Sequence, residues 1–136
     1  MRFGSKIALV IRNDLAGWQK LNVAAFLTSG VLADNPGIIG QAYEDAEGRI
    51  YSALIGRPII VLSASGEVMR QIFERATSRN VRLSLYIEDM FATRCDEENR
   101  AAVKRHVPNH MSIVGLGMCH DRAVVDRITK GARMHD

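Results

Sequence analysis

The chain has 136 residues, a length typical of one domain, so we expect residues 1–136 to form a single domain. Hydrophobic residues make up 47% and charged residues 24%, which argues against intrinsic disorder because enough apolar surface is available to offset chain entropy. The net charge of +3 permits an anionic ligand without requiring nucleic acid. No apolar run approaches the ~18 residues of a membrane span and no signal peptide is recognised, so the sequence predicts a cytoplasmic protein without a membrane segment.

The two cysteines, Cys95 and Cys119, are predicted to be reduced thiols because no secretory signal accompanies them. Neither lies in a CxxC or another spacing typical of zinc sites. The Gly-Leu-Gly segment at residues 115–117 lacks the third glycine of a dinucleotide fingerprint. The sequence therefore predicts no metal site and no bound cofactor.

Strands and helices are expected to alternate along the chain. In chain order we predict a strand at 6–12, a helix at 18–32, a short hairpin with strands at 41–43 and 49–53, a strand at 58–63, a helix at 66–78, a strand at 81–87, a helix at 96–105, a strand at 112–116 and a helix at 121–130. Such alternation predicts an α/β fold, with helices on both faces of a mostly parallel sheet and the strands at 6–12, 58–63 and 81–87 as parallel neighbours. The first helix is expected to bury the face that carries Leu21, Ala25 and Val31.

The densest polar segment at a strand end is residues 88–94. Ligands of such sheets bind beyond the carboxyl ends of the parallel strands. In this position Asp89 could act as an acid or base, Thr93 could hydrogen-bond a substrate, and Arg94 could hold a phosphate or carboxylate. The alternative is structural, with Asp89 capping a turn and Thr93 capping the next helix.

Three segments together resemble the peptidyl-tRNA hydrolase type 2 family. KIALVIRNDL at 6–15, followed by Lys20 and VAAFLTSG at 23–30, is similar to the family's opening strand, lysine-rich loop and helix. IEDMFATR at 87–94 resembles its D-A-G-R-T segment, and residues 108–117, ending in IVGLG, resemble its P-G-S…LGIG strand. The resemblance runs from about residue 6 to residue 130. It implies a three-layer α/β/α sandwich with a mixed sheet of four core strands, the last of them antiparallel, and a homodimer.

Part of the family's polar pattern is replaced in this chain. The family's helix-start lysine falls on Asn22, its glutamine on Phe26 and its histidine on Ser29, whereas its Asp and Thr are kept as Asp89 and Thr93. Because an asparagine supplies neither a positive charge nor acid–base chemistry, half of the constellation is missing. The chain thus resembles a divergent branch of the superfamily rather than a true peptidyl-tRNA hydrolase.

The first functional hypothesis is a binding protein. A cleft at the strand ends would hold a small or anionic ligand, or a tRNA-like one. The replacements described above make this cleft more apolar than the family's. The ligand-binding residues would be Asn22, Ser29 and Arg94.

The alternative hypothesis is a hydrolase that cleaves an ester or acyl bond, as in a peptidyl-tRNA-like substrate. Lys20 would hold the anion, Asp89 would act as the base and Thr93 would position the substrate. We expect these three residues to line one cleft with Asn22 and Ser29, and Lys20 to form an ion pair with Asp89. The expectation assumes that the strand before Asp89 lies beside the first strand.

Overall fold

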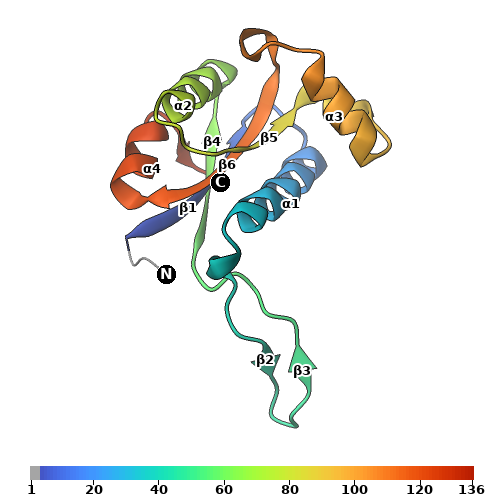
Figure 1. Cartoon of the computed structure of the whole chain (residues 1–136), viewed down its shortest axis with the longest axis vertical. Helices are drawn as coiled ribbons and strands as arrows, with labels where there is room; N and C mark the ends of the chain where they lie inside the picture. Colours follow the sequence, from blue (N-terminus) through green and yellow to red (C-terminus); the bar gives the residue numbers. More distant parts are fainter. Residues whose placement is uncertain (1–3) are drawn as a thin grey trace.

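The computed structural model describes residues 4–136 and has an α/β fold (Figure 1). Its elements in chain order are β1 (Ser5–Arg12), α1 (Gly17–Asp34), the 3-10 turn η1 (Pro36–Ile38), β2 (Tyr43–Glu44), β3 (Ile50–Tyr51), β4 (Ile59–Ala64), α2 (Gly66–Ser78), β5 (Ser84–Ile87), the 3-10 turn η2 (Glu88–Ala92), α3 (Asp96–Lys104), the 3-10 turn η3 (Pro108–His110), β6 (Ile113–Asp121), α4 (Arg122–Ile128) and β7 (Arg133–Met134). The predicted strands, helices and hairpin are confirmed. The main differences are that β6 ends five residues later than predicted and that α4 is shorter.

The sheet is mixed and has five strands in the order β5-β6-β1-β4-β7. β1 pairs in parallel with β4 but antiparallel with β6, and β6 pairs antiparallel with β5. The mixed sheet and the antiparallel direction of β6 are as expected. β1, β4 and β5 run in the same direction, but the prediction that all three are neighbours is wrong, because β6 lies between β1 and β5. The reason is burial: residues 113–118 of β6 are all buried, so this strand needs cover on both faces, whereas the short β5 suits an edge.

Helices cover both faces of the sheet (Figure 1). On one face α2 and α4 pack on the even-numbered side chains of β1, Ala8 and Val10. On the other face α1 packs on the odd-numbered side chains, Ile7, Leu9 and Ile11. None of the helices in residues 4–136 has both the length and the apolarity that a membrane crossing requires.

Helix α1 turns a different face to the sheet than its sequence suggested. It buries Val23, Leu27 and Val31, whereas Leu21 is 76% exposed. Apolar residues occur almost all round this helix, so their periodicity does not single out one face. The glycines of β6 decide the contact, because α1 lies so close to the strand that a Cβ at Gly115 would be 2.5 Å from Val23 Cγ1.

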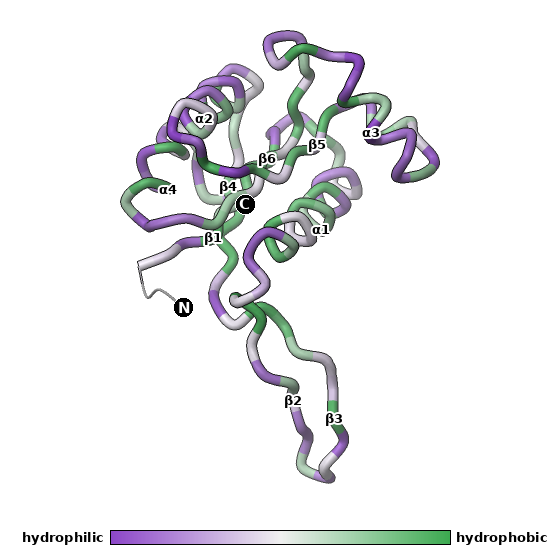
Figure 2. The backbone as a smooth tube through the Cα atoms, viewed as in Figure 1, coloured by the Kyte–Doolittle hydropathy of each residue, from purple (hydrophilic) through white to green (hydrophobic). Residues whose placement is uncertain are grey.

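Between α1 and β4 the chain forms a hairpin arm, residues 39–55, that projects away from the sheet (Figure 1). Its base is fixed by two backbone hydrogen bonds, from Gly40 N to Leu54 O and from Gly56 N to Ile38 O, both 2.8 Å long. Every residue from 41 to 52 is exposed. Figure 2 shows apolar stretches on both strands where the arm leaves the body.

Candidate functional site

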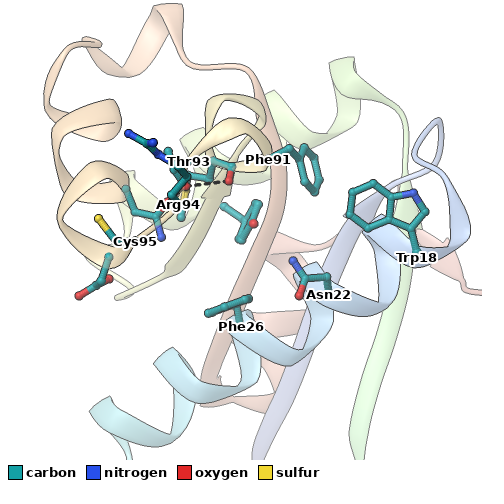
Figure 3. Close-up of a pocket in the computed structure, with 11 residues that line it drawn as sticks. Trp18, Asn22, Phe26, Phe91, Thr93, Arg94 and Cys95 are labelled. Atoms are coloured by element: carbon teal, nitrogen blue, oxygen red, sulfur yellow. Dashed lines mark hydrogen bonds between the residues drawn. The ribbon is translucent and has the colours of Figure 1, made fainter.

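A cleft of about 410 Å³ opens between α1 and the segment that follows β5. This volume lies in the range of small-molecule sites. Trp18, Asn22 and Phe26 line it from α1, where their spacing of four residues places them on one face of the helix. Figure 3 shows them opposite the chain from η2 to the start of α3. That side and β5 contribute Tyr86, Met90, Phe91, Thr93, Arg94, Cys95, Asp96 and Asn99.

Four aromatic rings form a connected series along the cleft. The ring centroids of Trp18 and Phe91 are 6.0 Å apart, those of Phe91 and Tyr86 5.3 Å, and those of Tyr86 and Phe26 6.0 Å. Tyr86 is buried, but Trp18 is 64% exposed and Phe26 is 55% exposed. Such contiguous exposed aromatic surface is typical of a site that another molecule covers.

The side chains of Asn22 on α1 and Tyr86 on β5 interact in the lining of the cleft. Burial raises the pKa of the Tyr86 phenol, and the interaction with Asn22 offsets part of that rise. Asn22 therefore links α1 to one of the four rings.

Arg94 is the exposed cation of the cleft. Its side chain is 87% exposed, and its guanidinium lies 3.3 Å from a carboxylate oxygen of Glu98. The backbone N–H of Arg94 also donates to Glu98, at 2.8 Å. Because an exposed ion pair contributes little free energy, the guanidinium can exchange Glu98 for an anionic ligand at small cost. The adjacent Thr93 donates its hydroxyl proton to the Met90 carbonyl oxygen at 2.9 Å.

Asp89 lies outside this cleft. Its Oδ2 is 2.9 Å from Nε2 of His106 and 4.0 Å from a guanidinium nitrogen of Arg105. The hydrogen bond to His106 holds the pKa of the Asp89 carboxyl below its ordinary value. Asp89 faces a separate hollow of about 260 Å³, which Thr93 also lines. In the described part of the chain, no three His, Cys, Asp or Glu side chains are placed to hold a metal ion.

Lys20 and Ser29 also lie outside the cleft. Because α1 begins at Gly17, Lys20 is part of the helix, and two positions of separation place it about 200° around the axis from Asn22. Among residues 4–136, Lys20 has no ion pair, so the expected pair with Asp89 is not formed. Ser29 shares the face of Asn22 but stands about 10 Å farther along the axis.

Of the six residues predicted from the sequence, the cleft thus unites three, Asn22, Thr93 and Arg94. The sequence interpretation missed its aromatic lining. The spacing of Trp18, Asn22 and Phe26 was a usable signal, because it is the spacing of one helical face. No local signal marks Tyr86 and Phe91, since they reach α1 only through the pairing of β5 with β6.

A closed network of charges holds η2 against the end of β1. The Arg12 guanidinium lies 2.6 Å from Asp14, 3.0 Å from Glu88 and 3.1 Å from the Ser112 hydroxyl. Burial alone would lower the pKa of Arg12, but its hydrogen bonds to Asp14 and Glu88 outweigh that effect and raise it. Bonds from Ser112 and Arg12 lower the pKa of Glu88. Because Glu88 begins η2, the network fixes one wall of the cleft.

Comparisons with known proteins place the chain among relatives of unknown function. A solved structure of a protein of unknown function from Agrobacterium tumefaciens strain C58 is 45% identical, with a TM-score of 0.97 over 99% of this chain and 100% of that chain. So high a score means that nearly the whole chain superposes on that structure. No curated protein matches. Residues 5–136 match the family described as "Protein of unknown function (DUF2000)", and the chain belongs to that family.

Proposed function

We propose that the protein binds a small ligand that has a planar ring and an anionic group. The observation that carries the proposal is the cleft of about 410 Å³, in which four aromatic rings lie beside an exposed arginine. Apolar and aromatic walls with a few convergent polar groups are typical of small-molecule sites. A ring-shaped ligand would cover the exposed faces of Trp18 and Phe26, which otherwise contact water.

Each wall of the cleft has a separate role in this proposal. The rings of Trp18, Phe26 and Phe91 hold the planar part of the ligand by offset or edge contacts. Arg94 holds the anionic group and gives up Glu98 when the ligand enters. Asn22 keeps Tyr86 in place beneath the ligand.

The proposal includes the wider relationship that the sequence suggested. We regard the chain as a divergent member of the peptidyl-tRNA hydrolase type 2-like α/β/α sandwiches. Support comes from the co-linear motifs and from helices on both faces of a mixed sheet whose last long strand is antiparallel. A cytoplasmic location is part of the same proposal, because Cys95 and Cys119 are both thiols.

A hydrolase remains the second candidate because Asp89 is paired with a histidine. A carboxylate that orients an imidazole is a common arrangement for a general base, and Thr93 lines the same hollow as Asp89. In this candidate His106 is the side-chain partner of Asp89, a role for which the sequence suggested Lys20. Turnover of peptidyl-tRNA and of a panel of small esters, compared with Asp89→Ala, tests it. Absence of turnover on every substrate, or turnover that Asp89→Ala leaves unchanged, would exclude it.

The binding proposal can be tested with the fluorescence of Trp18, the chain's single tryptophan. Titrants would be aromatic sulfonates and carboxylates, adenosine monophosphate, tRNA, and neutral aromatic compounds of the same shape. We expect at least one anionic aromatic probe to change the emission of Trp18 with a dissociation constant below about 1 mM.

Two variants distinguish binding of the probes in the cleft from attraction by the general surface charge. Arg94→Gln should weaken the anionic probes about tenfold but leave the neutral ones unchanged. Arg82→Gln is the matched control, because Arg82 is 83% exposed and neither it nor its ion-pair partner Asp34 lines the cleft. If Arg94→Gln and Arg82→Gln weaken the binding of the probes equally, or if no probe affects Trp18, the proposal is wrong.

A further inference from the structure

The exposed apolar side chains of this protein gather on two elements. Of the ten large apolar side chains that are exposed among residues 4–136, eight lie on α1 and on the hairpin arm. Those on α1 are Trp18, Leu21 and Phe26, and those on the arm are Ile39, Tyr43, Ile50, Tyr51 and Leu54. A two-stranded hairpin without further cover is marginally stable in water, so both elements expose surface that another molecule would stabilise by covering it.

The arm is apolar on both of its faces. Tyr43 lies opposite Tyr51 on one face, while Ile50, paired with Glu44, points to the other face. Tyr51 donates its hydroxyl proton to Asp45 at 2.9 Å, so the polar end of this ring is satisfied within the arm and its apolar part stays exposed. The two backbone hydrogen bonds at its base fix the direction in which the arm leaves the body.

We infer that the hairpin arm of one copy docks on the exposed face of α1 of a second copy, and that two such contacts form a symmetric dimer. The dimensions agree: α1, with 18 residues, is about 27 Å long, and each side of the arm spans about 23 Å. The arm continues beyond the C-terminal end of α1 (Figure 1). A two-fold axis that places one arm beside the partner's helix therefore places the second arm beside the first helix.

Charge and area also favour a second copy as the occupant. The arm carries Glu44, Asp45 and Glu47 against Arg49, a net charge of −2, while the whole chain is +3. Arg82, which is 83% exposed, lies beside Asp34 at the C-terminal end of α1 and offers the acidic arm an opposite charge. Without Trp18 and Phe26, which the proposed ligand covers, the other six apolar side chains offer on the order of 100 Å² each, about 600 Å² per partner and ~1,200 Å² in total, the lower end of the range for specific interfaces.

Sedimentation velocity of the full chain over a wide concentration range tests the inference. The wild type should form a dimer. The arm variant Tyr43→Ser/Ile50→Ser and the helix variant Leu21→Ser should each raise the dimer dissociation constant at least about tenfold. All three side chains are about half exposed or more, so both variants should keep the wild-type fold, with an unchanged far-UV circular dichroism spectrum. Val107→Ser is the matched control, because Val107 is 58% exposed but lies on neither element.

Mixing the two variants distinguishes the loss of a specific contact between arm and helix from a general loss of apolar surface. A mixed dimer keeps one intact contact, between the arm of the helix variant and the α1 of the arm variant. Because the mutated side chains of the arm and of α1 contact each other, a contact that lacks both of them is little weaker than one that lacks either. The mixture should therefore contain more dimer than either variant alone at the same total concentration. A wild type that stays monomeric, or a dimer that both variants leave unchanged, overturns the inference. So does a mixture that is no more dimeric than its components.

Discussion

The close contact between α1 and β6 makes Gly115→Ala a direct test of how the cleft is built. A Cβ at this position would lie 2.5 Å from Val23 Cγ1 and 2.9 Å from Leu27 Cδ1. Both side chains are essentially fully buried, so neither has open space to move into. Ordinary carbon contacts are about 3.5–4 Å long, and the substitution therefore requires α1 to move outward by about 1 Å or its side chains to leave their rotamers.

We expect Gly115→Ala to lower the free energy of unfolding by about 1–3 kcal/mol, the range found for overpacked cores. The cleft should change as well, because Asn22 precedes Val23 in α1 and Phe26 precedes Leu27. A helix displaced from the sheet carries Asn22 away from Tyr86, so aromatic probes should bind more weakly to this variant.

Equilibrium unfolding in urea, followed by far-UV circular dichroism, measures the change, with an unchanged m value as the check on two-state behaviour. Gly17→Ala is the matched control, since Gly17 opens α1 and a Cβ there has no atom within 4 Å. It should be neutral or stabilising by about 0.4–1 kcal/mol, because alanine reduces the entropy of the unfolded chain. If Gly115→Ala unfolds within about 0.5 kcal/mol of the wild type, α1 is not packed on β6 as described.

Two further predictions concern the chain around β5. Ile87 is fully buried and Leu85 only partly. Ile87→Ala should therefore lower the free energy of unfolding in urea by about 2–5 kcal/mol, and Leu85→Ala should lower it clearly less. Equal losses would contradict the burial of β5. The pKa of Asp89 is lowered by its bond to His106, so its carboxylate stabilises the fold above the ordinary pKa of ~3.9, and this contribution is lost as the pH falls through the lower folded-state value. Asp89→Asn should therefore be less stable than the wild type at pH 6, and the difference should shrink as the pH falls below about 4; urea midpoints measure it, and a difference independent of pH would refute this.

Local sequence was sufficient to predict the strands and helices but not the order of the strands. β1, β4 and β6 are continuous apolar runs, and such runs indicate buried strands wherever they pair. The neighbour of each strand depends on how the whole chain folds back. The sequence of residues 84–87 is compatible with a strand beside β1 and with an edge strand beyond β6. The length and burial of β6 determine that β5 is the edge strand.

The candidate site was predictable only where one helix face or one loop carries it. Asn22 could be predicted because the position of the first helix is evident from the sequence. Thr93 and Arg94 could be predicted because a loop that follows a strand is a common ligand position, and all three residues line the cleft. Lys20 was misplaced because the family resemblance assigned it to a loop, whereas it lies within α1, on another side of the helix from Asn22. The partner of Asp89 was missed because His106 is distant in sequence and belongs to no motif.

The interaction between Asn22 and Tyr86 gives a last prediction, which concerns alkaline pH. Burial raises the pKa of the Tyr86 phenol above its ordinary value of ~10, so its neutral form stabilises the fold below pH 10 and this contribution is lost as the pH rises through the folded-state value. The interaction with Asn22 lowers that pKa, so Asn22→Ala should move the titration of Tyr86 to still higher pH. Absorbance at 295 nm, with Tyr86→Phe subtracted to isolate this tyrosine from the other two, measures the shift. A titration that stays in place or moves to lower pH would show that Asn22 does not bind the phenol, and α1 would then lose its polar link to the rings of the cleft.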